Sequence, residues 1–262
     1  MHTLSRLQHP LVGLILFFFA ITSCTKPTQL PGTASLTVVN AVAGNTTLAI
    51  TVDNLDTVNL SNEFQTLGYG NNLEFSSYTG EHVFHFYQYV VTANGLLSVN
   101  AAVIYPALSN VSLNLPVGSI SSLFLAGTVN APDTLFVKDA LPVLNPADSS
   151  MGIRFVNLSP GSNPVSVDIQ GSGTGNVVNS LPYKDITPFG TYAANSAVSG
   201  LTFEFRDAES DSVLATYTIS GINNPGTSTP NSWLNNNYTI VFAGLPGANP
   251  SVPQTAFLVN NY

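Results

Sequence analysis

The sequence has little charge of either sign and very few basic residues. Only 8% of its 262 residues are charged, six of them are Lys or Arg, and the formal net charge is −8. The five bases that follow residue 24 are scattered: Lys26, Lys138, Arg154, Lys184 and Arg206. Because no basic run is present to neutralise phosphates or anionic lipid headgroups, the composition argues against nucleic-acid binding and against electrostatic adhesion to a membrane.

The helix-favouring residues Glu, Lys, Arg and Met are also scarce, whereas Val, Thr, Tyr and Phe are abundant and 44% of the chain is hydrophobic. Disordered chains combine low hydrophobicity with high charge, so this composition excludes them. No segment beyond the amino terminus has the 3.6-residue period of an amphipathic helix. The composition therefore predicts a folded chain built from β-strands.

Long apolar runs are absent except at the amino terminus. There, the run Leu11–Ile21 follows a short segment that carries Arg6. Its length matches the roughly 7–15 residues of a signal-peptide core and falls short of the about 20 residues of a transmembrane helix. We therefore expect residues 1–23 to be an export signal.

The chain has a single cysteine, Cys24, which follows Ile21, Thr22 and Ser23. An aliphatic residue and two small residues before a cysteine resemble a bacterial lipobox. The resemblance implies that Cys24 carries diacylglycerol, with acyl chains such as palmitate, and becomes the first residue of the mature protein. A lone cysteine in an exported protein cannot close an internal disulfide, which favours a lipobox over an ordinary signal with an incidental cysteine.

Residues 24–33 are expected to form the lipidated cysteine and a flexible tether, because they are rich in Thr, Pro and Gly and have no apolar period. Two or more acyl chains give stable anchoring where one binds marginally. We expect anchoring in the bacterial cell envelope, at the outer membrane. No acid lies between Thr25 and Gln29, so the periplasmic and the surface-exposed face both stay open.

The rest of the chain contains one unit twice. Asn40 and Asn157 are 117 positions apart (157 − 40), and so are Gly44 and Gly161 (161 − 44). Near the other end of the unit, SLFLAG, which starts at Ser122, falls on TIVFAG at the same offset. A constant offset at both ends indicates an internal duplication. We place the first repeat at 34–146 and the second at 151–262, with the boundary in NPADSS (145–150).

Both repeats alternate apolar and more polar residues with the period of a half-buried strand. Leu48, Ile50 and Val52 follow this pattern in the first repeat, and Leu201, Phe203 and Phe205 follow it in the second. Further strands are expected at Ser35–Asn40, Glu81–Val91, Gly95–Tyr105, Ser212–Ile219, Asn237–Ala243 and Thr255–Val259. Six to eight short strands in about 110 residues predict an all-β fold of two tandem immunoglobulin-like antiparallel β-sandwich domains.

Three segments of the second repeat carry a family resemblance. They contain Arg154, Val156, Asn157, Ser159 and Pro160, then Val167, Asp168 and Gly171, and finally Tyr238–Gly244. These residues resemble the "R-V-V-N-x-S-P", "V-D-V-x-x-(D)G" and "Y-T-V-x-x-x-G" strands of the secreted bacterial family called domain of unknown function 4397. In the first repeat Ala41, Val42 and Ala43 replace the Leu-Ser-Pro turn, and Thr51 replaces the Asp. The resemblance spans essentially the whole mature chain and implies no activity.

Catalytic and metal-binding patterns are few. His82 and His85, the only histidines beyond Cys24, are three apart on an expected strand and should point to opposite faces, so they cannot share a metal. The second repeat has no histidine and cannot form a Ser-His-Asp triad by itself. Gly171–Gly175 precedes no helix pattern and is typical of a loop tip. We expect no catalytic residue and no cofactor.

One acidic cluster and one aromatic cluster leave alternatives open. Asp207, Glu209 and Asp211 alternate between two expected strands and could hold Ca²⁺ through oxygen ligands, although we favour a solvated hairpin turn. Asp53 and Asp56 suggest the same metal more weakly.

In the expected strand Glu81–Val91, Phe84 and Phe86 share one face, and Tyr87 and Tyr89 share the other. The tyrosines either bind a sugar or protein ligand or pack in a core or against the other repeat.

The sequence thus predicts a non-enzymatic, lipid-anchored cell-envelope protein that serves as a binding, adhesion or structural module. Its expected partners are a membrane, through Cys24, and an envelope protein or glycan. The alternative is an envelope hydrolase that acts on glycans through two carboxylates. A subunit of a larger envelope assembly is a third hypothesis. The analogy with adhesion domains is one of fold only.

Overall fold

The computed structural model describes residues 32–44, 47–53, 64–76, 79–91, 97–98, 107–172, 177–223, 231–247 and 252–261. The expected signal, Cys24 and Asp56 lie outside these residues, as does most of the strand expected over Gly95–Tyr105. No helix in the described ranges is long and apolar enough to cross a membrane.

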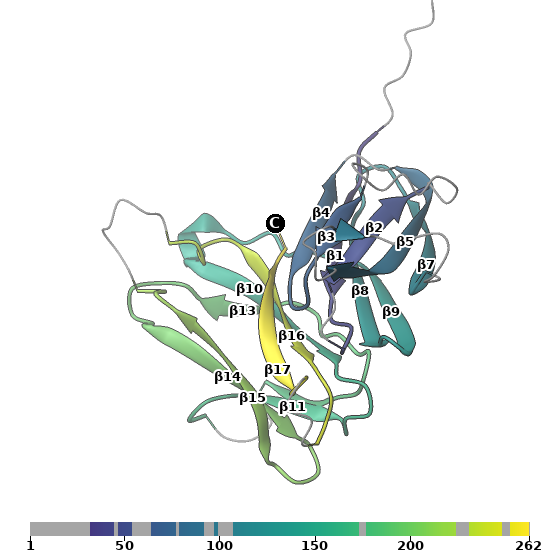
Figure 1. Ribbon diagram of the computed structural model, residues 1–262. Helices are drawn as coiled ribbons and strands as arrows, with labels where there is room; N and C mark the ends of the chain where they lie inside the picture. The colour runs from purple at the N-terminus through teal and green to yellow at the C-terminus, as the bar shows by residue number, and fades with distance from the viewer. Residues whose placement is uncertain are drawn as a thin grey trace, which may run out of the picture. The chain divides into compact units, whose positions relative to one another are not determined.

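The first repeat is a β-sandwich of two sheets (Figure 1). One sheet has the order β4 (Asn72–Ser76), β1 (Ser35–Asn40), β8 (Ile120–Thr128) and β9 (Ala131–Lys138). The other has the order β3 (Gln65–Leu67), β2 (Thr47–Val52), β5 (Gly80–Val91) and β6 (Leu97–Ser98), with β7 (Ser109–Leu115) also paired to β5. Strand β1 runs antiparallel to β4 and parallel to β8.

The second repeat has the same topology. Its first sheet has the order β13 (Gly190–Ala193), β10 (Ser150–Leu158), β16 (Asn237–Ala243) and β17 (Thr255–Asn260). Its second sheet has the order β12 (Val178–Leu181), β11 (Val165–Ile169), β14 (Gly200–Asp207) and β15 (Val213–Ser220). Strand β10 runs antiparallel to β13 and parallel to β16, as β1 does to β4 and β8. The prediction of two tandem β-sandwiches is confirmed.

The order in which the strands are connected differs from that of immunoglobulin domains. Immunoglobulin domains place strands A, B, E and D in one sheet and C, F and G in the other. Here the first strand of each repeat lies in one sheet with the fourth strand and the last two, and the second strand lies in the opposite sheet. The likeness to immunoglobulin domains is therefore one of architecture.

A short 3₁₀ helix, η1 (Pro146–Asp148), connects the repeats. Asn145 caps it by accepting a hydrogen bond from the Ala147 amide at 3.1 Å, and Ser149 ends it in the left-handed conformation with φ 46°. Proline at the first helical position has no amide to satisfy there. The chain thus turns within NPADSS before β10 begins at Ser150.

Each sandwich has its own apolar core, filled by the alternating residues of facing strands. Leu48, Ile50, Phe84 and Phe86 belong to the first core, as the period-two pattern predicts. Phe155, Phe203, Phe205 and Phe242 belong to the second. The rings of Phe205 and Phe242 stack at 5.2 Å with 11° between their planes, which joins β14 to β16 across the second sandwich.

The two asparagines that mark the duplication tie the sheets of each sandwich together. The Asn157 amide donates to the Leu181 carbonyl at 3.0 Å, and its carbonyl accepts from the Ser159 amide at 3.0 Å. Asn40 makes the same bonds to the Leu67 carbonyl and the Val42 amide, at 3.0 and 3.1 Å. Both side chains are fully buried. The asparagine of the repeated motif therefore has a structural role.

We predict that Asn157→Ala lowers the free energy of unfolding by about 2–4 kcal/mol, because it leaves a buried carbonyl and a buried amide without partners. Urea unfolding measures the change. Asn179→Ala, at an exposed position on β12, is the control and should shift stability by less than about 0.5 kcal/mol. Equal effects of the two substitutions would contradict the assigned role of Asn157.

Candidate functional site

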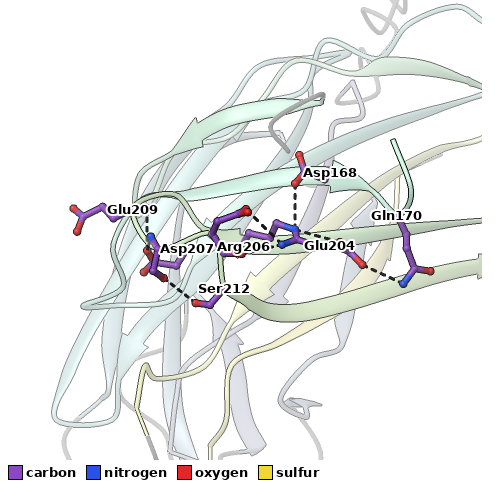
Figure 2. Close-up of polar contacts among 9 residues, drawn as sticks. Asp168, Gln170, Glu204, Arg206, Asp207, Glu209 and Ser212 are labelled. Atoms are coloured by element: carbon purple, nitrogen blue, oxygen red, sulfur yellow. Dashed lines mark hydrogen bonds and ion pairs between the residues drawn. The ribbon is translucent and has the colours of Figure 1, made fainter. Parts of the chain in front are cut away.

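The outer face of the second sandwich carries a cluster of charged side chains on β11 and β14 (Figure 2). Because Val165 and Val167 point into the core, Ser166 and Asp168 point to the outer face of the same sheet. Glu204 and Arg206 share this face on β14. Asp168 lies directly opposite Glu204, and Ser166 lies opposite Arg206.

Arg206 is the centre of this cluster, which we call the Arg206 cluster. Its Nη2 lies 2.6 Å from Glu204 Oε2, its Nε lies 3.3 Å from Asp168 Oδ2, and its Nη1 donates to the Asp211 carbonyl at 2.8 Å. Gln170 donates to the other oxygen of Glu204 at 3.1 Å. The hydrogen bond with Glu204 raises the pKa of Arg206, so the guanidinium stays charged and holds both carboxylates.

Of the three acids considered as calcium ligands, Asp207 ends β14, and Glu209 and Asp211 lie in the turn that leads to β15. Asp207 Oδ1 accepts from the Glu209 amide at 2.9 Å and from the Ser210 amide at 2.8 Å. Asn163 donates to the other oxygen of Asp207 at 3.0 Å. The Ser210 amide, followed by Asn163 and the Glu209 amide, lowers the pKa of Asp207. Asp207 thus closes the hairpin turn, and Asp211 contributes its carbonyl to Arg206.

No group of three or more His, Cys, Asp or Glu side chains within the described ranges is arranged to hold a metal ion. His82 and His85 lie in β5 with different partners. His82 Nδ1 is 2.6 Å from Asp53 Oδ2, whereas His85 is 1% exposed and its Nδ1 is 2.7 Å from Asn110 Oδ1. Burial raises the pKa of Asp53, but the hydrogen bonds from His82 and the Val83 amide outweigh burial and lower it.

The two tyrosines considered as a ligand surface lie on the face of β5 opposite Phe84 and Phe86. Tyr87 is only 7% exposed and presents little surface to a ligand. Tyr89 is half-buried, and its ring lies 5.8 Å from that of Phe64. The side chains therefore serve packing more than contact with solvent.

A third apolar core joins the two repeats. Its signal in the sequence is the pair of continuous apolar runs Leu123–Ala126 and Ile240–Ala243, which are typical of strands buried on both faces. It is built from the outer faces of the sheets that contain β1 and β8 in one repeat and β10, β16 and β17 in the other. Its fully buried members are Val39, Ala41, Phe124, Ala126, Val156, Leu158, Val241, Ala243 and Val259. Because these faces cover each other, every residue of β10 and of β16 is buried.

A buried ion pair lies within this shared core. Arg154 Nη1 of the second repeat is 2.8 Å from Asp139 Oδ1 of the first, and the two side chains are 3% and 1% exposed. Arg154 also donates to Ser122 at 3.3 Å and to Thr239 at 2.8 Å, and its guanidinium lies 4.6 Å from the centre of the Phe189 ring. Burial lowers the pKa of Arg154, and Asp139 opposes this effect.

A second ion pair crosses the rim of the same interface. Lys184 Nζ lies 2.7 Å from Asp133 Oδ1, and the Tyr183 hydroxyl donates to Asp133 Oδ2 at 3.3 Å. Lys184 adopts the left-handed conformation with φ 67°. Its amide donates to the Asn157 carbonyl, as the amide of Gly70 with φ 75° donates to the Asn40 carbonyl. The second repeat therefore places a lysine in a strained conformation where the first has glycine.

We predict that the free energy of unfolding of the Lys184→Gly variant is about 1 kcal/mol higher than that of the Lys184→Ala variant. Both substitutions remove the ion pair with Asp133, but only glycine relieves the left-handed strain. Urea unfolding of the two variants side by side separates strain from charge. An alanine variant as stable as the glycine variant would show that the backbone at Lys184 is unstrained.

The contact between Tyr183 and Asp133 at the rim predicts that the stability of the protein depends on pH. Burial, reinforced by the Asp133 carboxylate, raises the pKa of Tyr183 to about 12 from its ordinary value of 10.0. Because the folded pKa lies above the unfolded one, the contribution of Tyr183 to stability is complete below pH 10 and is lost as the pH rises through about 12. Asp133→Asn should lower the pKa of Tyr183. Ultraviolet titration of tyrosinate, with Tyr183→Phe to identify the signal, tests this, and an unchanged titration in Asp133→Asn would contradict it.

No family model matches the sequence. A search of curated proteins also finds no match. Membership of the family called domain of unknown function 4397 stays a prediction.

Proposed function

We propose that this protein is a lipid-anchored component of the bacterial cell envelope whose two repeats form a rigid, non-enzymatic binding or structural module. The observation that carries the proposal is the shared core between the repeats, with Arg154 and Asp139 buried in it. The lone Cys24 and the apolar run before it support the anchor. The outer membrane is the proposed site of anchoring.

A rigid pair of sandwiches suits a module that holds a surface at a fixed place above a membrane. Two domains with a small polar interface move relative to each other by default, whereas a large apolar interface restrains them. Here the interface is apolar, and a buried ion pair with three further partners for Arg154 fixes its register. A preorganised surface loses less entropy when it binds a partner.

The Arg206 cluster bears on the choice between a binding module and a hydrolase. A glycosidase needs two carboxylates that flank the scissile bond, with space for a substrate and, in inverting enzymes, a water between them. Asp168 and Glu204 are cross-strand neighbours, which favours the hydrolase as the second candidate. However, Arg206 forms ion pairs with both. Asp168 is 2% and Glu204 8% exposed, so neither carboxylate has the space beside it that bond cleavage needs, and the arrangement argues against the hydrolase.

We predict that Cys24→Ser moves the protein to the soluble fraction, or leaves its signal uncut, without unfolding the repeats. Lipid on Cys24 is the proposed source of membrane affinity, and removing two or more acyl chains abolishes stable anchoring. Cell fractionation together with labelling by an alkyne fatty acid measures both effects, and Ser23→Ala, which keeps the thiol, is the control. A processed serine variant that stays in the membrane fraction would contradict the anchor.

The non-enzymatic part of the proposal is tested separately with a glycan array and a hydrolysis screen on envelope glycans. Binding without turnover is the expected result. Turnover that is lost in both Asp168→Asn and Glu204→Gln, while the folded state is retained, would replace the binding module with the hydrolase.

A further inference from the structure

The interface between the two repeats is formed by the same positions on both. Val39 and Val156 both belong to the shared core, and so do Ala126 and Ala243, at the offset of 117 that relates the repeats (156 − 39 and 243 − 126). The strand pairings extend this equivalence to β9 and β17, because Val137 faces Ser122 as Val259 faces Thr239. Contacts between equivalent surfaces are typical of the isologous interface of a symmetric dimer.

The buried ion pair breaks this symmetry. Arg154 of the second repeat corresponds to Thr37 of the first, since Arg154 pairs with Thr239 as Thr37 pairs with Ser122. Asp139 of the first repeat corresponds to Asn261 of the second, since their amides donate to the Ile120 and Asn237 carbonyls, which are also equivalent.

The hydroxyl groups beside the acid and its counterpart confirm this assignment. Ser122 donates to Asp139 at 2.7 Å, and Thr239 donates to Asn261 in the same way. The pair Arg154–Asp139 thus has a symmetry-related counterpart, Thr37 and Asn261. Within the described part of the chain, the buried Thr37 Oγ1 and Asn261 Nδ2 have no hydrogen-bond partner. The ion pair is therefore formed at only one of the two symmetry-related positions, with its base on the second repeat and its acid on the first.

The ion pair at the rim also takes its base from the second repeat and its acid from the first. Lys184 of the second repeat stands where the first repeat has Gly70, and its partner Asp133 belongs to the first repeat. In both ion pairs that cross the interface among the described residues, the base comes from the second repeat and the acid from the first. The two faces have become complementary to each other while their apolar residues still correspond.

We propose that Arg154 and Asp139 make this face of the first repeat a docking surface specific for the second repeat, and that they exclude pairing of like repeats. The occupant is the second repeat of the same chain. A contact between two first repeats would bury two copies of Asp139 without a base, and a contact between two second repeats would bury two copies of Arg154 without an acid. Burying an unpaired charge is strongly unfavourable, and such penalties are how interfaces reject wrong partners.

The exclusion matters most for a protein that is concentrated at a surface. Apolar faces as symmetric as these would otherwise allow repeats of neighbouring copies to associate. The charge pair confines the interface to the two repeats of one chain. This inference depends on the geometry of the interface alone and goes beyond the proposed function, since it holds whether or not Cys24 is lipidated.

The test uses the full chain with a protease site placed in the linker at Val143, which is fully exposed. After cleavage, native mass spectrometry distinguishes complexes of two first repeats, two second repeats, or one of each, because the halves differ in mass. The natural residues should give only the mixed complex. The double variant Arg154→Thr with Asp139→Asn gives each repeat the residues that the other already uses at these positions. It should raise the share of like-repeat complexes by about tenfold or more.

Two further variants keep the test decisive. Arg154→Asp with Asp139→Arg reverses the charges and should restore the mixed complex alone. Asp148→Asn, at an exposed position on η1, removes one charge outside the interface and should leave the pairing unchanged. Circular dichroism of each uncut variant shows that it is folded. Like-repeat complexes in the natural chain, separation of its halves, or a charge-reversed variant that behaves as the neutral one would each overturn the proposal.

Discussion

The burial of β10 and β16 on both faces is the constraint on which the rest of the structure depends. A strand in an antiparallel sandwich normally buries one face and shows the other to water. Here the inner residues of these strands fill the second core, and the outer residues fill the core shared between the repeats. Any polar side chain on the outer face must then find its partners inside the protein. Arg154 does so through Asp139, Ser122 and Thr239, which belong to both repeats.

Three of the few bases have acidic partners within the described part of the protein. Arg154, Lys184 and Arg206 each pair with at least one acid, and the ion pairs of Arg154 and Lys184 cross between the repeats. Surface ion pairs add little to stability, whereas removing one partner of a buried pair is strongly destabilising. Of these ion pairs, the buried one between Arg154 and Asp139 is therefore the one that fixes the register of the two repeats.

Much of the fold could be predicted from the sequence, because strand alternation and the 117-residue offset depend on local pattern. Ser35–Asn40 and Asn237–Ala243 are strands with the predicted bounds. Alternation also places Glu204 and Arg206 on one face of β14, so the Arg206 cluster had a signal in the sequence. Asp168 could not be added to it, because the partner strand and its register come from the tertiary fold.

The shared core had a different signal, because the continuous apolar runs Leu123–Ala126 and Ile240–Ala243 are typical of strands buried on both faces. Such a run does not show which surface covers the second face, so the sequence alone could not place the shared core. The asymmetry of the charged residues in this core can be explained from the duplication. A duplicated unit begins with two identical faces, and identical faces meet isologously. A buried Arg without Asp139, or a buried Asp without Arg154, would destabilise that contact, so the two charges stabilise it only together. A buried ion pair adds little net stability over apolar residues. Its contribution here is specificity, because it decides which repeat pairs with which.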